Sequence, residues 1–278
     1  HFGMKKVGTY RNLGNAMNYK TLSIETSNKI CTMKFNRPEK LNAFDSQMVI
    51  ETQEALNQIS IDNEIKVLVI TGEGKGFSAG ADLSDSTGMD DHSNDRLVYE
   101  GLINGYKPSL LQIMNMPKPV IGAINGAAAG IGSAFALACD LVVMSEDAYI
   151  KQAFVNIALI PDGGLNWLLT RTVGYRLAYQ MAIEGNNVSA ERCLELGLAN
   201  KVVPHDQLMH ASMEWAESLS RKSSQSLRET KRVMRMAMTN DYESVFEQEA
   251  EANNTLHGSK DSLEAIQAFF EKREPNFD

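Results

Sequence analysis

Long apolar runs are missing from this 278-residue sequence. Its longest apolar stretches, such as Val67-Leu68-Val69-Ile70, have the length of buried strands, whereas a membrane-spanning helix needs roughly 20 apolar residues. We therefore expect no membrane partner. An excess of basic residues is also missing, because 27 Lys and Arg face 35 Asp and Glu, for a net charge of −8. This balance excludes a general nucleic-acid binder, which needs a basic surface.

Cysteine and metal-binding patterns are scarce as well. Cys31, Cys139 and Cys193 lie far apart without metal-ligand spacing, and the five histidines form no HExxH or paired motif. We therefore predict no metal site. No GxGxxG stands in a suitable place and no Walker loop occurs. With no signal peptide visible, the reducing cytoplasm is the default location.

Strands and helices alternate in the first two thirds of the chain, which indicates an α/β fold with right-handed βαβ units. We expect residues 1–17 to be an N-terminal extension, in part a cloning remnant, since His1, Phe2 and Gly3 precede Met4 and Met17 is a second candidate start. Residues 18–200 should form the α/β core and residues 201–278 a helical C-terminal region. The acidic, Ser-rich residues 82–95 predict a surface loop beside a site.

The expected elements follow from apolar periodicity and turn residues. A helix over 97–116 should be interrupted at Lys107-Pro108, and a small-residue helix should cover 127–139. Further strands are expected within 21–35 and at 66–71, 119–123 and 141–144, and further helices at 45–60, 165–171, 175–183, 189–195, 204–222, 224–237, 242–256 and 260–272.

Two glycine-rich corners follow strands, Gly74 to Leu83 and Ile124 to Asp140. Small residues there allow close packing of helix and sheet. They also leave backbone N–H groups bare, and those of Gly130 and Ile131 would lie at a helix start, where the dipole is positive. Two such donors aimed at one point can hold a carbonyl oxygen as it becomes an oxyanion. Both interpretations remain open.

A single acid, Asp162, stands among apolar residues in the stretch ALIPDGGLNW. Pro161-Asp162-Gly163 is ordinary turn chemistry, because Pro fixes φ, Asp bonds back to the backbone and Gly accepts positive φ. The apolar neighbours, among them Ile160 and Trp167, also suit an acid whose pKa is raised for catalysis.

Four motifs in order, NRPEKLNAF, GFSAGADL, INGAAAGIGSAFALACD and LIPDGG, resemble the crotonase superfamily, the enoyl-CoA hydratase/isomerase family. The resemblance runs from about Tyr19 to Phe277. It implies a spiral of ββα units with a helical C-terminal trimerisation region, assembled as trimers or dimers of trimers. It also implies that a CoA thioester is the substrate, that no separate cofactor is needed, and that two backbone amides polarise the thioester carbonyl.

The same resemblance implies the site residues. The oxyanion-hole amides would be those of Ala81 and Ile131, and Asp162 would be the catalytic acid. Phe154 and Trp167 are candidate pocket walls or plain core aromatics. The full set of implied CoA and substrate contacts is Lys40, Leu41, Ser78, Ala79, Gly80, Asp82, Leu83, Gly130, Phe154, Pro161, Trp167 and Lys272, the last across a subunit boundary.

The chain departs from the hydratases of the family at two positions. Where those enzymes carry two catalytic Glu residues, it has Ala134 and Phe154. Asp162, in contrast, falls where isomerases of the family place their acid, and the single-Asp isomerases of the phenylacetate pathway share this pattern most fully. The resemblance therefore implies an isomerase that shifts a double bond through a dienolate.

Three alternatives stay open. A hydratase would use Asp162 with a substrate-held water. An aryl-CoA dehalogenase would use the same Asp as a nucleophile beside an aromatic wall, for which Phe154 is available. From another class, a non-catalytic acyl-CoA or protein-binding module would explain the missing hydratase acids but not the retained Asp162 and amide corners.

Overall fold

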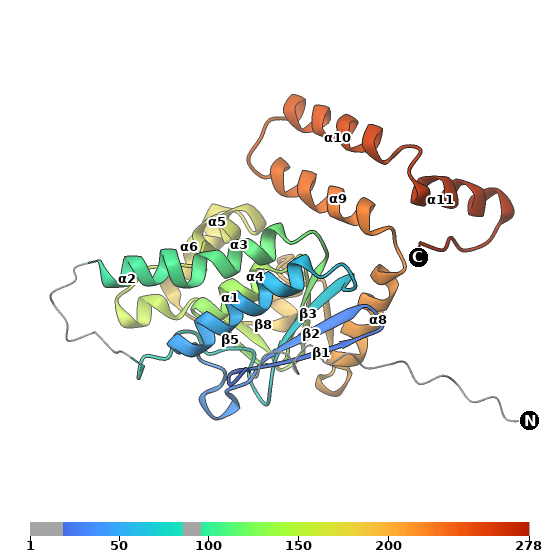
Figure 1. The fold of residues 1–278 in the computed structure, drawn as a ribbon. Helices are drawn as coiled ribbons and strands as arrows, with labels where there is room; N and C mark the ends of the chain where they lie inside the picture. The colour runs from blue at the N-terminus through green and yellow to red at the C-terminus, as the bar shows by residue number, and fades with distance from the viewer. Residues whose placement is uncertain (1–18, 86–95, 278) are drawn as a thin grey trace, which may run out of the picture.

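The computed structural model describes residues 19–85 and 96–277. Residues 86–95 of the expected loop, and the whole of the extension expected at residues 1–17, lie outside these ranges. Among the described residues a six-stranded sheet forms the centre of the body (Figure 1). Its first two strands are antiparallel and all others pair in parallel. Its spatial order is β1 (Leu22–Ser27), β2 (Ile30–Phe35), β3 (Val67–Gly72), β4 (Val120–Ile124), β6 (Leu141–Ser145) and β9 (Lys201–Val203).

The sheet separates two hydrophobic cores because its central strands are buried on both faces. Leu68 and Ile70 of β3 belong to the larger core, while Val67 and Val69 belong to the smaller one. The larger core packs under α1 (Ser46–Ile61), α3 (Lys107–Asn115), α4 (Ile131–Ala138), α5 (Leu165–Thr172), α6 (Tyr175–Glu184) and α7 (Ala190–Glu195). The smaller core packs under α8 (Leu208–Ser220).

The second glycine corner differs from the expected helix over 127–139. Ala127–Ala129 is a strand, β5, which pairs in parallel with β7 (Tyr149–Lys151), and β7 pairs with β8 (Asn187–Ser189) in a small second sheet. The carbonyl of Ala127 accepts the amides of Phe77 and Ser78, which fixes extended backbone there. Gly130 has φ +53°, so α4 starts only at Ile131. The three-residue strands β5, β7, β8 and β9 are too short to give a periodic signal.

The helix around Pro108 widens instead of breaking. α2 (Leu97–Glu100) leads into a π-helical segment, Gly101–Tyr106, and α3 then begins at Lys107 with Pro108 in its first turn. Pro108 has no N–H to donate to the helical carbonyls before it, and the wider π-helical turn is where the chain accommodates that loss. The expected interruption is therefore a change of helix type.

The expected boundary after residue 200 needs correction. β9 pairs with β6 inside the main sheet, and Leu208 and Ala216 of α8 are buried against it. The helices that leave the body are α9 (Ser224–Ala237), α10 (Tyr242–Leu256) and α11 (Lys260–Glu271), which form an arm to one side (Figure 1). Ser223, Asp241 and Ser259 cap their N-termini, which explains why these helices were predicted closely.

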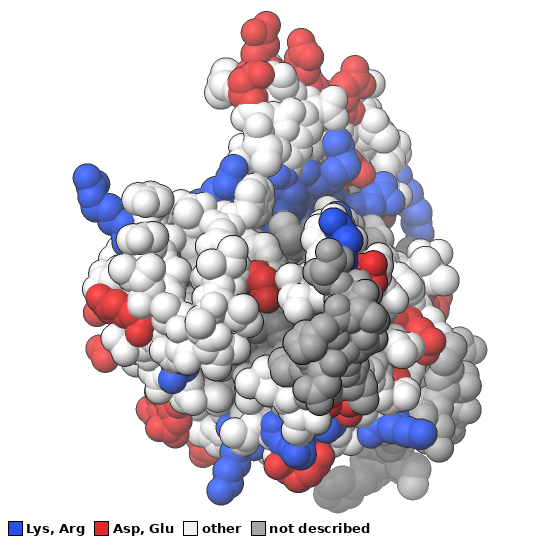
Figure 2. Space-filling view, turned by 90° about the vertical axis from the view of Figure 1, so that its left-hand side faces the viewer, with Lys and Arg blue, Asp and Glu red and all other residues white. Residues whose placement is uncertain are grey.

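Charges on the arm are divided between its two sides. Lys and Arg side chains gather where the arm meets the body, and acidic side chains lie along its outer edge (Figure 2). The basic group belongs to α9, where Lys231 and Arg235 both pair with Asp140 of the body, at 2.7 and 3.0 Å. These partly buried contacts hold the first arm helix against the core. No helix in the described ranges is long and apolar enough to cross a membrane.

Candidate active site

Asp162 lies in a tight turn between a 3-10 helix, Ala153–Ile157, and α5. Gly163 and Gly164 have φ +62° and +79°, a conformation that Gly adopts without steric cost. The Leu165 amide donates to the Asp162 carbonyl (3.1 Å), and the Asn166 side chain donates to the Pro161 carbonyl (2.6 Å). The predicted turn is thus present, and its backbone bonds fix the start of α5.

The turn presses directly against the start of α4. A Cβ placed on Gly163 would lie 2.6 Å from Cδ1 of Ile131 and 2.7 Å from Cβ of Ala134. Only a residue without a side chain allows this approach. Asp162 is therefore held beside the first turn of α4, next to the amide corner to which the sequence analysis assigned a role.

The Asp162 carboxyl is half-buried, and its Oδ1 is a buried atom without a hydrogen-bond partner. Burial raises the pKa of Asp162 from 3.8 to about 6. A buried polar atom left unsatisfied costs free energy, and a carboxyl whose pKa burial has raised is a candidate for a catalytic role. At neutral pH this group is ionised but basic enough to accept a proton from a carbon acid.

The Ile131 amide is the first of α4. Gly130 donates its own N–H to the Lys151 carbonyl (3.0 Å), and its φ of +53° turns the chain into the helix. The first N–H groups of a helix have no intrahelical acceptor, and the helix dipole adds positive potential there. The Ile131 N–H is therefore available to a ligand oxygen.

The Ala81 amide is available for a different reason. Phe44 pairs with Ala81 in a parallel bridge, in which Phe44 donates to the Gly80 carbonyl (2.7 Å) and accepts from the Asp82 amide (2.8 Å). Both bonds use the peptide groups on either side of Ala81, so the N–H of Ala81 itself points away from Phe44. Ala81 is exposed in the described structure.

The two corners touch at their glycines. A Cβ on Gly80 would lie 3.0 Å from the Ala129 carbonyl oxygen, and one on Gly130 would lie 3.8 Å from Cα of Gly80. Phe154 lies beside the same two glycines, with its Cζ 4.0 Å from the Cβ position of Gly130. The structure thus brings Gly80, Ala81, Gly130, Ile131, Phe154 and Asp162 into one region, although their separations in sequence are large.

Tyr106 is a neighbour of this region that the sequence analysis missed. Its ring meets Phe44 edge-on at 5.9 Å between centroids, and Leu110, one turn later, lies 3.4 Å from the Cβ position of Gly163. Burial raises the pKa of Tyr106 to about 12, with a further contribution from the charge of Asp162. The sequence signal that could indicate Tyr106 is its place four residues before Leu110 on an interrupted helix.

Comparison with known proteins places this geometry in context. The profile described as enoyl-CoA hydratase/isomerase matches residues 25–278. The chain belongs to the enoyl-CoA hydratase/isomerase family. It is therefore an enzyme of a family that acts on CoA thioesters, and its fold is the crotonase fold, as predicted.

Individual relatives carry both kinds of activity in their names. The chain is 35% identical over 248 residues to a 1,2-epoxyphenylacetyl-CoA isomerase of Escherichia coli K12, covering 89% of this chain and 94% of the relative. It is also 35% identical over 261 residues to a probable enoyl-CoA hydratase of Rhodobacter capsulatus, covering 94% and 99%. The crystal structure of an enoyl-CoA hydratase from Bacillus anthracis matches with a TM-score of 0.87 and 29% identity, covering 93% and 100%.

Other predicted contacts of this family member lie around the first glycine corner. Leu41 and Ala79 are exposed, and the Ala79 amide donates to the Leu41 carbonyl (2.9 Å). Lys40 and Leu83 are exposed nearby in sequence, whereas Ser78 is buried with its Oγ accepting the Gly80 amide (3.2 Å). Asp82 is occupied by Arg37 and Ser84. Direct contact of these residues with CoA remains a prediction.

Trp167 and Lys272 are not brought to Asp162 by any described contact. The Trp167 ring packs against the Arg171 guanidinium at 4.4 Å and lines a cavity of about 540 Å³ with Met114, Arg232 and Arg235. Lys272 is exposed at the end of α11, in the arm. Trp167 thus faces α9, which the sequence could not indicate because α9 is some 60 residues further along.

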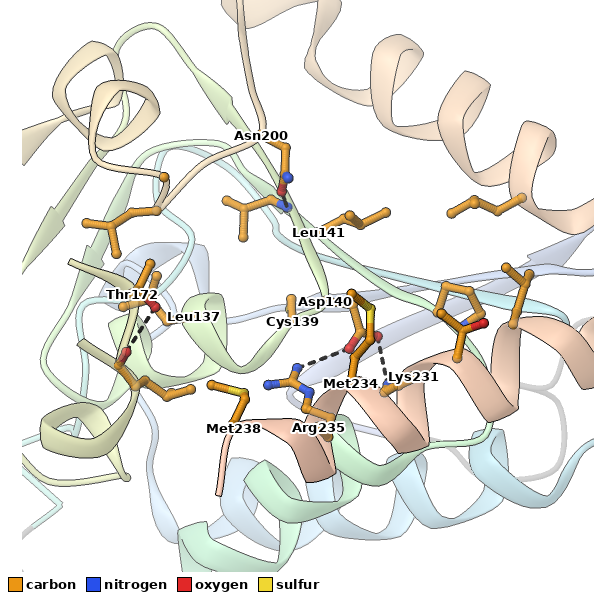
Figure 3. A pocket seen from close by; sticks show the side chains of 18 residues that line it. Leu137, Cys139, Asp140, Leu141, Thr172, Asn200, Lys231, Met234, Arg235 and Met238 are labelled. Carbon is orange, nitrogen blue, oxygen red and sulfur yellow. Dashed lines mark hydrogen bonds and ion pairs between the residues drawn. The ribbon is translucent and has the colours of Figure 1, made fainter. Parts of the chain in front are cut away.

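The apolar cavity between the body and α9 contains none of the predicted site residues (Figure 3). Its volume is about 450 Å³, and Leu141, Met234 and Met238 are among its lining residues. Asp140 lies at its side, where it accepts the Val120 amide (2.9 Å) and pairs with Lys231 and Arg235. Both oxygens of this acid are thus held by the protein, which indicates a structural role.

Proposed function

We propose that this enzyme is an acyl-CoA isomerase that moves a double bond along the acyl chain, with Asp162 as its one acid–base group. Asp162 takes a proton from C2 of a 3-enoyl thioester and returns it to C4. The double bond thereby moves from the C3–C4 position to the C2–C3 position. In the intermediate dienolate the negative charge lies on the thioester oxygen. The N–H groups of Ala81 and Ile131 would hold that oxygen, an arrangement that stabilises the charge as it forms.

One observation carries the proposal: Asp162 lies beside the first turn of α4, with a buried oxygen that has no protein partner. A carboxylate held only by structure would satisfy both oxygens, as Asp140 does with Val120, Lys231 and Arg235. In the proposed complex the substrate would supply the contact that Oδ1 of Asp162 lacks. Its pKa of about 6 suits proton transfer near neutral pH.

Hydration has weaker support in this chain. Adding water across a double bond requires one group to activate the water and another to protonate the substrate carbon. Ala134 is fully buried and Phe154 is 6% exposed, so the two positions where hydratases of the family carry their acids present only apolar groups. An apolar wall also limits stray attack of water on the dienolate.

The test compares wild type with Asp162→Asn on 3-hexenoyl-CoA, with product identity established by chromatography. We expect the variant to fold and bind the thioester, and to lose double-bond migration by roughly a thousand-fold, the size typical of a lost acid–base group. Glu184→Gln is the control, since Glu184 is an exposed acid at the end of α6 that bonds to Gln180 and Asn186. Full activity of Asp162→Asn would refute the assignment.

A second assay separates isomerase from hydratase. The wild type is incubated with crotonyl-CoA, whose double bond already lies between C2 and C3. We expect the enoyl absorbance to persist, because double-bond migration favours the conjugated 2-enoyl thioester at equilibrium and the site lacks a second acid for hydration. Rapid loss of absorbance with 3-hydroxyacyl-CoA as product would favour the hydratase.

We also propose that copies of this chain associate through the arm. Phe269 and Phe270 on α11 are each 78% exposed, and Tyr242 on α10 is 84% exposed. Adjacent exposed aromatic side chains mark an interaction surface in a folded protein. A second copy is the occupant that the resemblance implies, and Lys272 lies at the same end of α11, where a CoA phosphate held by the partner copy could meet it.

A further inference from the structure

Arg37 joins the segments that surround the Ala81 peptide. Its Nε lies 3.1 Å from Oδ2 of Asp45, one terminal nitrogen lies 3.0 Å from Oδ2 of Asp82, and the other donates to the carbonyl of Ala43. The three charged side chains are largely buried, with 15% of Arg37, 21% of Asp45 and 8% of Asp82 exposed. One guanidinium therefore makes three contacts in one plane, which its rigid fork allows.

These contacts hold the backbone immediately before and after Ala81. The segment 43–45 lies along the segment 80–82, joined by the two backbone bonds of Phe44 to Gly80 and Asp82. Arg37 links the C-terminal ends of the two segments, because it pairs with Asp45, which follows Phe44, and with Asp82, which follows Ala81. The remaining Asp82 oxygen accepts from the amide and hydroxyl of Ser84 (3.0 and 2.6 Å). Asp82 thus has little freedom to rotate.

We propose that Arg37 is a positioning residue that fixes the direction of the Ala81 N–H toward the thioester oxygen. The proposal rests on the function above, in which that N–H is one of two donors to the oxygen. A donor contributes to catalysis only when it points to the place where charge develops, and small misalignments cost large factors in rate. The two backbone bonds from Phe44 set the position of Ala81. The Arg37–Asp82 pair keeps the backbone at Asp82 from rotating, so the Ala81 N–H keeps its direction.

Arg37→Lys separates positioning from simple stabilisation. Lysine keeps the positive charge but cannot reach Asp45, Asp82 and the Ala43 carbonyl together. Arg235→Lys is the matched control, because Arg235 also joins a buried acid (Asp140, 3.0 Å) to a carbonyl (Ala138, 3.0 Å) and is 19% exposed. Arg235 is outside the proposed catalytic machinery, at the junction of the arm and the body.

The readouts are the melting temperature, kcat and KM on 3-hexenoyl-CoA, and the infrared carbonyl band of bound hexanoyl-CoA carrying ¹³C at the thioester carbon. We expect both variants to melt at lower temperature than wild type. Only Arg37→Lys should lower kcat, by about ten-fold to a hundred-fold, with little change in KM. Only in this variant should the carbonyl band of bound hexanoyl-CoA return toward its position in free hexanoyl-CoA. If Arg37→Lys fails to fold, Asp82→Asn takes its place, with the same losses expected in smaller measure.

The carbonyl band keeps this proposal distinct from the proposed function, because hexanoyl-CoA has no double bond to move. A wild type that shifts the band but does not isomerise 3-hexenoyl-CoA contradicts the isomerase and leaves Arg37 to be judged by the band alone. A variant with wild-type kcat and an unchanged band overturns the role of Arg37. A wild-type complex with an unshifted band overturns it as well, since no donor then polarises the carbonyl.

Discussion

Burial makes the Asp162 carboxyl hard to ionise, and this has a consequence for stability as well as for activity. Its pKa in the folded chain is about 6, against 3.8 without burial. The folded state therefore holds the proton more tightly than the unfolded state between these values. The favourable contribution is fully present below pH 3.8 and is lost as the pH rises through 6. The full conversion of this shift is about 3 kcal/mol, which solvent screening of the half-buried carboxylate reduces, so ionised Asp162 should destabilise the enzyme by on the order of 2 kcal/mol.

Asp162→Asn should consequently be more stable than wild type at pH 8, by a few degrees in melting temperature, with the difference shrinking toward pH 4. The same titration predicts that wild-type kcat/KM falls about ten-fold per pH unit below 6, because the base must be ionised to accept a proton. Thermal unfolding and rates measured across this range test both statements. Parallel stability curves for wild type and variant would contradict the burial of the charge.

Residues whose role depends on local chemistry could be predicted from the sequence, while those defined by distant partners could not. The three residues Pro161-Asp162-Gly163 alone predict a turn, and the turn is present with positive φ at Gly163. Arg37 and Asp82 are 45 residues apart, and no periodic pattern joins them. Tyr106 likewise contacts the ring of the distant Phe44, and the charge of the distant Asp162 contributes to its raised pKa.

At the scale of elements, contact between the Asp162 turn and α4 depends on a missing side chain. A Cβ at Gly163 would lie within 2.7 Å of Ile131 and Ala134 atoms, closer than real Cβ contacts come. Gly163→Ala should therefore push the turn away from α4 and carry Asp162 with it. We expect a loss of about 2 to 4 kcal/mol in stability, together with most of the activity.

Gly197→Ala is the control for this prediction. Gly197 has φ +72°, close to the +62° of Gly163, but no atom lies within 4 Å of its Cβ position. The control should pay only the backbone cost of about 1 kcal/mol and keep wild-type activity. Denaturant unfolding and 3-hexenoyl-CoA turnover compare the two. Equal losses in both variants would mean that backbone strain, not the clash, dominates.

The elements themselves were predictable where they are long and capped. α9 and α10 occupy the expected residues 224–237 and 242–256, with Ser223 and Asp241 as caps. Alanine favours helices, so the sequence predicts a helix from residue 127, whereas bonds from Phe77 and Ser78 make Ala127–Ala129 a strand. Tertiary contact overrides propensity in such short segments.

For the whole molecule, sequence patterns predicted the class of fold and the helical end of the chain but not where the body stops. β9 adds the last strand to the sheet and α8 covers its second core, so the arm starts near residue 224. Only the sheet order reveals this, since Lys201–Val203 is too short to read as a strand. The arm then leaves the body with large apolar side chains on α10 and α11 exposed.

Association through the arm predicts a mass in solution of three or six times 30.7 kDa for the wild type, measured by light scattering after gel filtration. Replacing Phe269 and Phe270 together by Ser should shift this mass toward one copy, because the two rings supply the largest exposed apolar area of α11. Ile61→Ser is the control: Ile61 is 79% exposed at the end of α1, on the body. Its removal should leave the mass unchanged. A wild type that stays at the mass of one copy at every concentration tested would exclude the arm as an interface, and the exposed rings would then need another occupant.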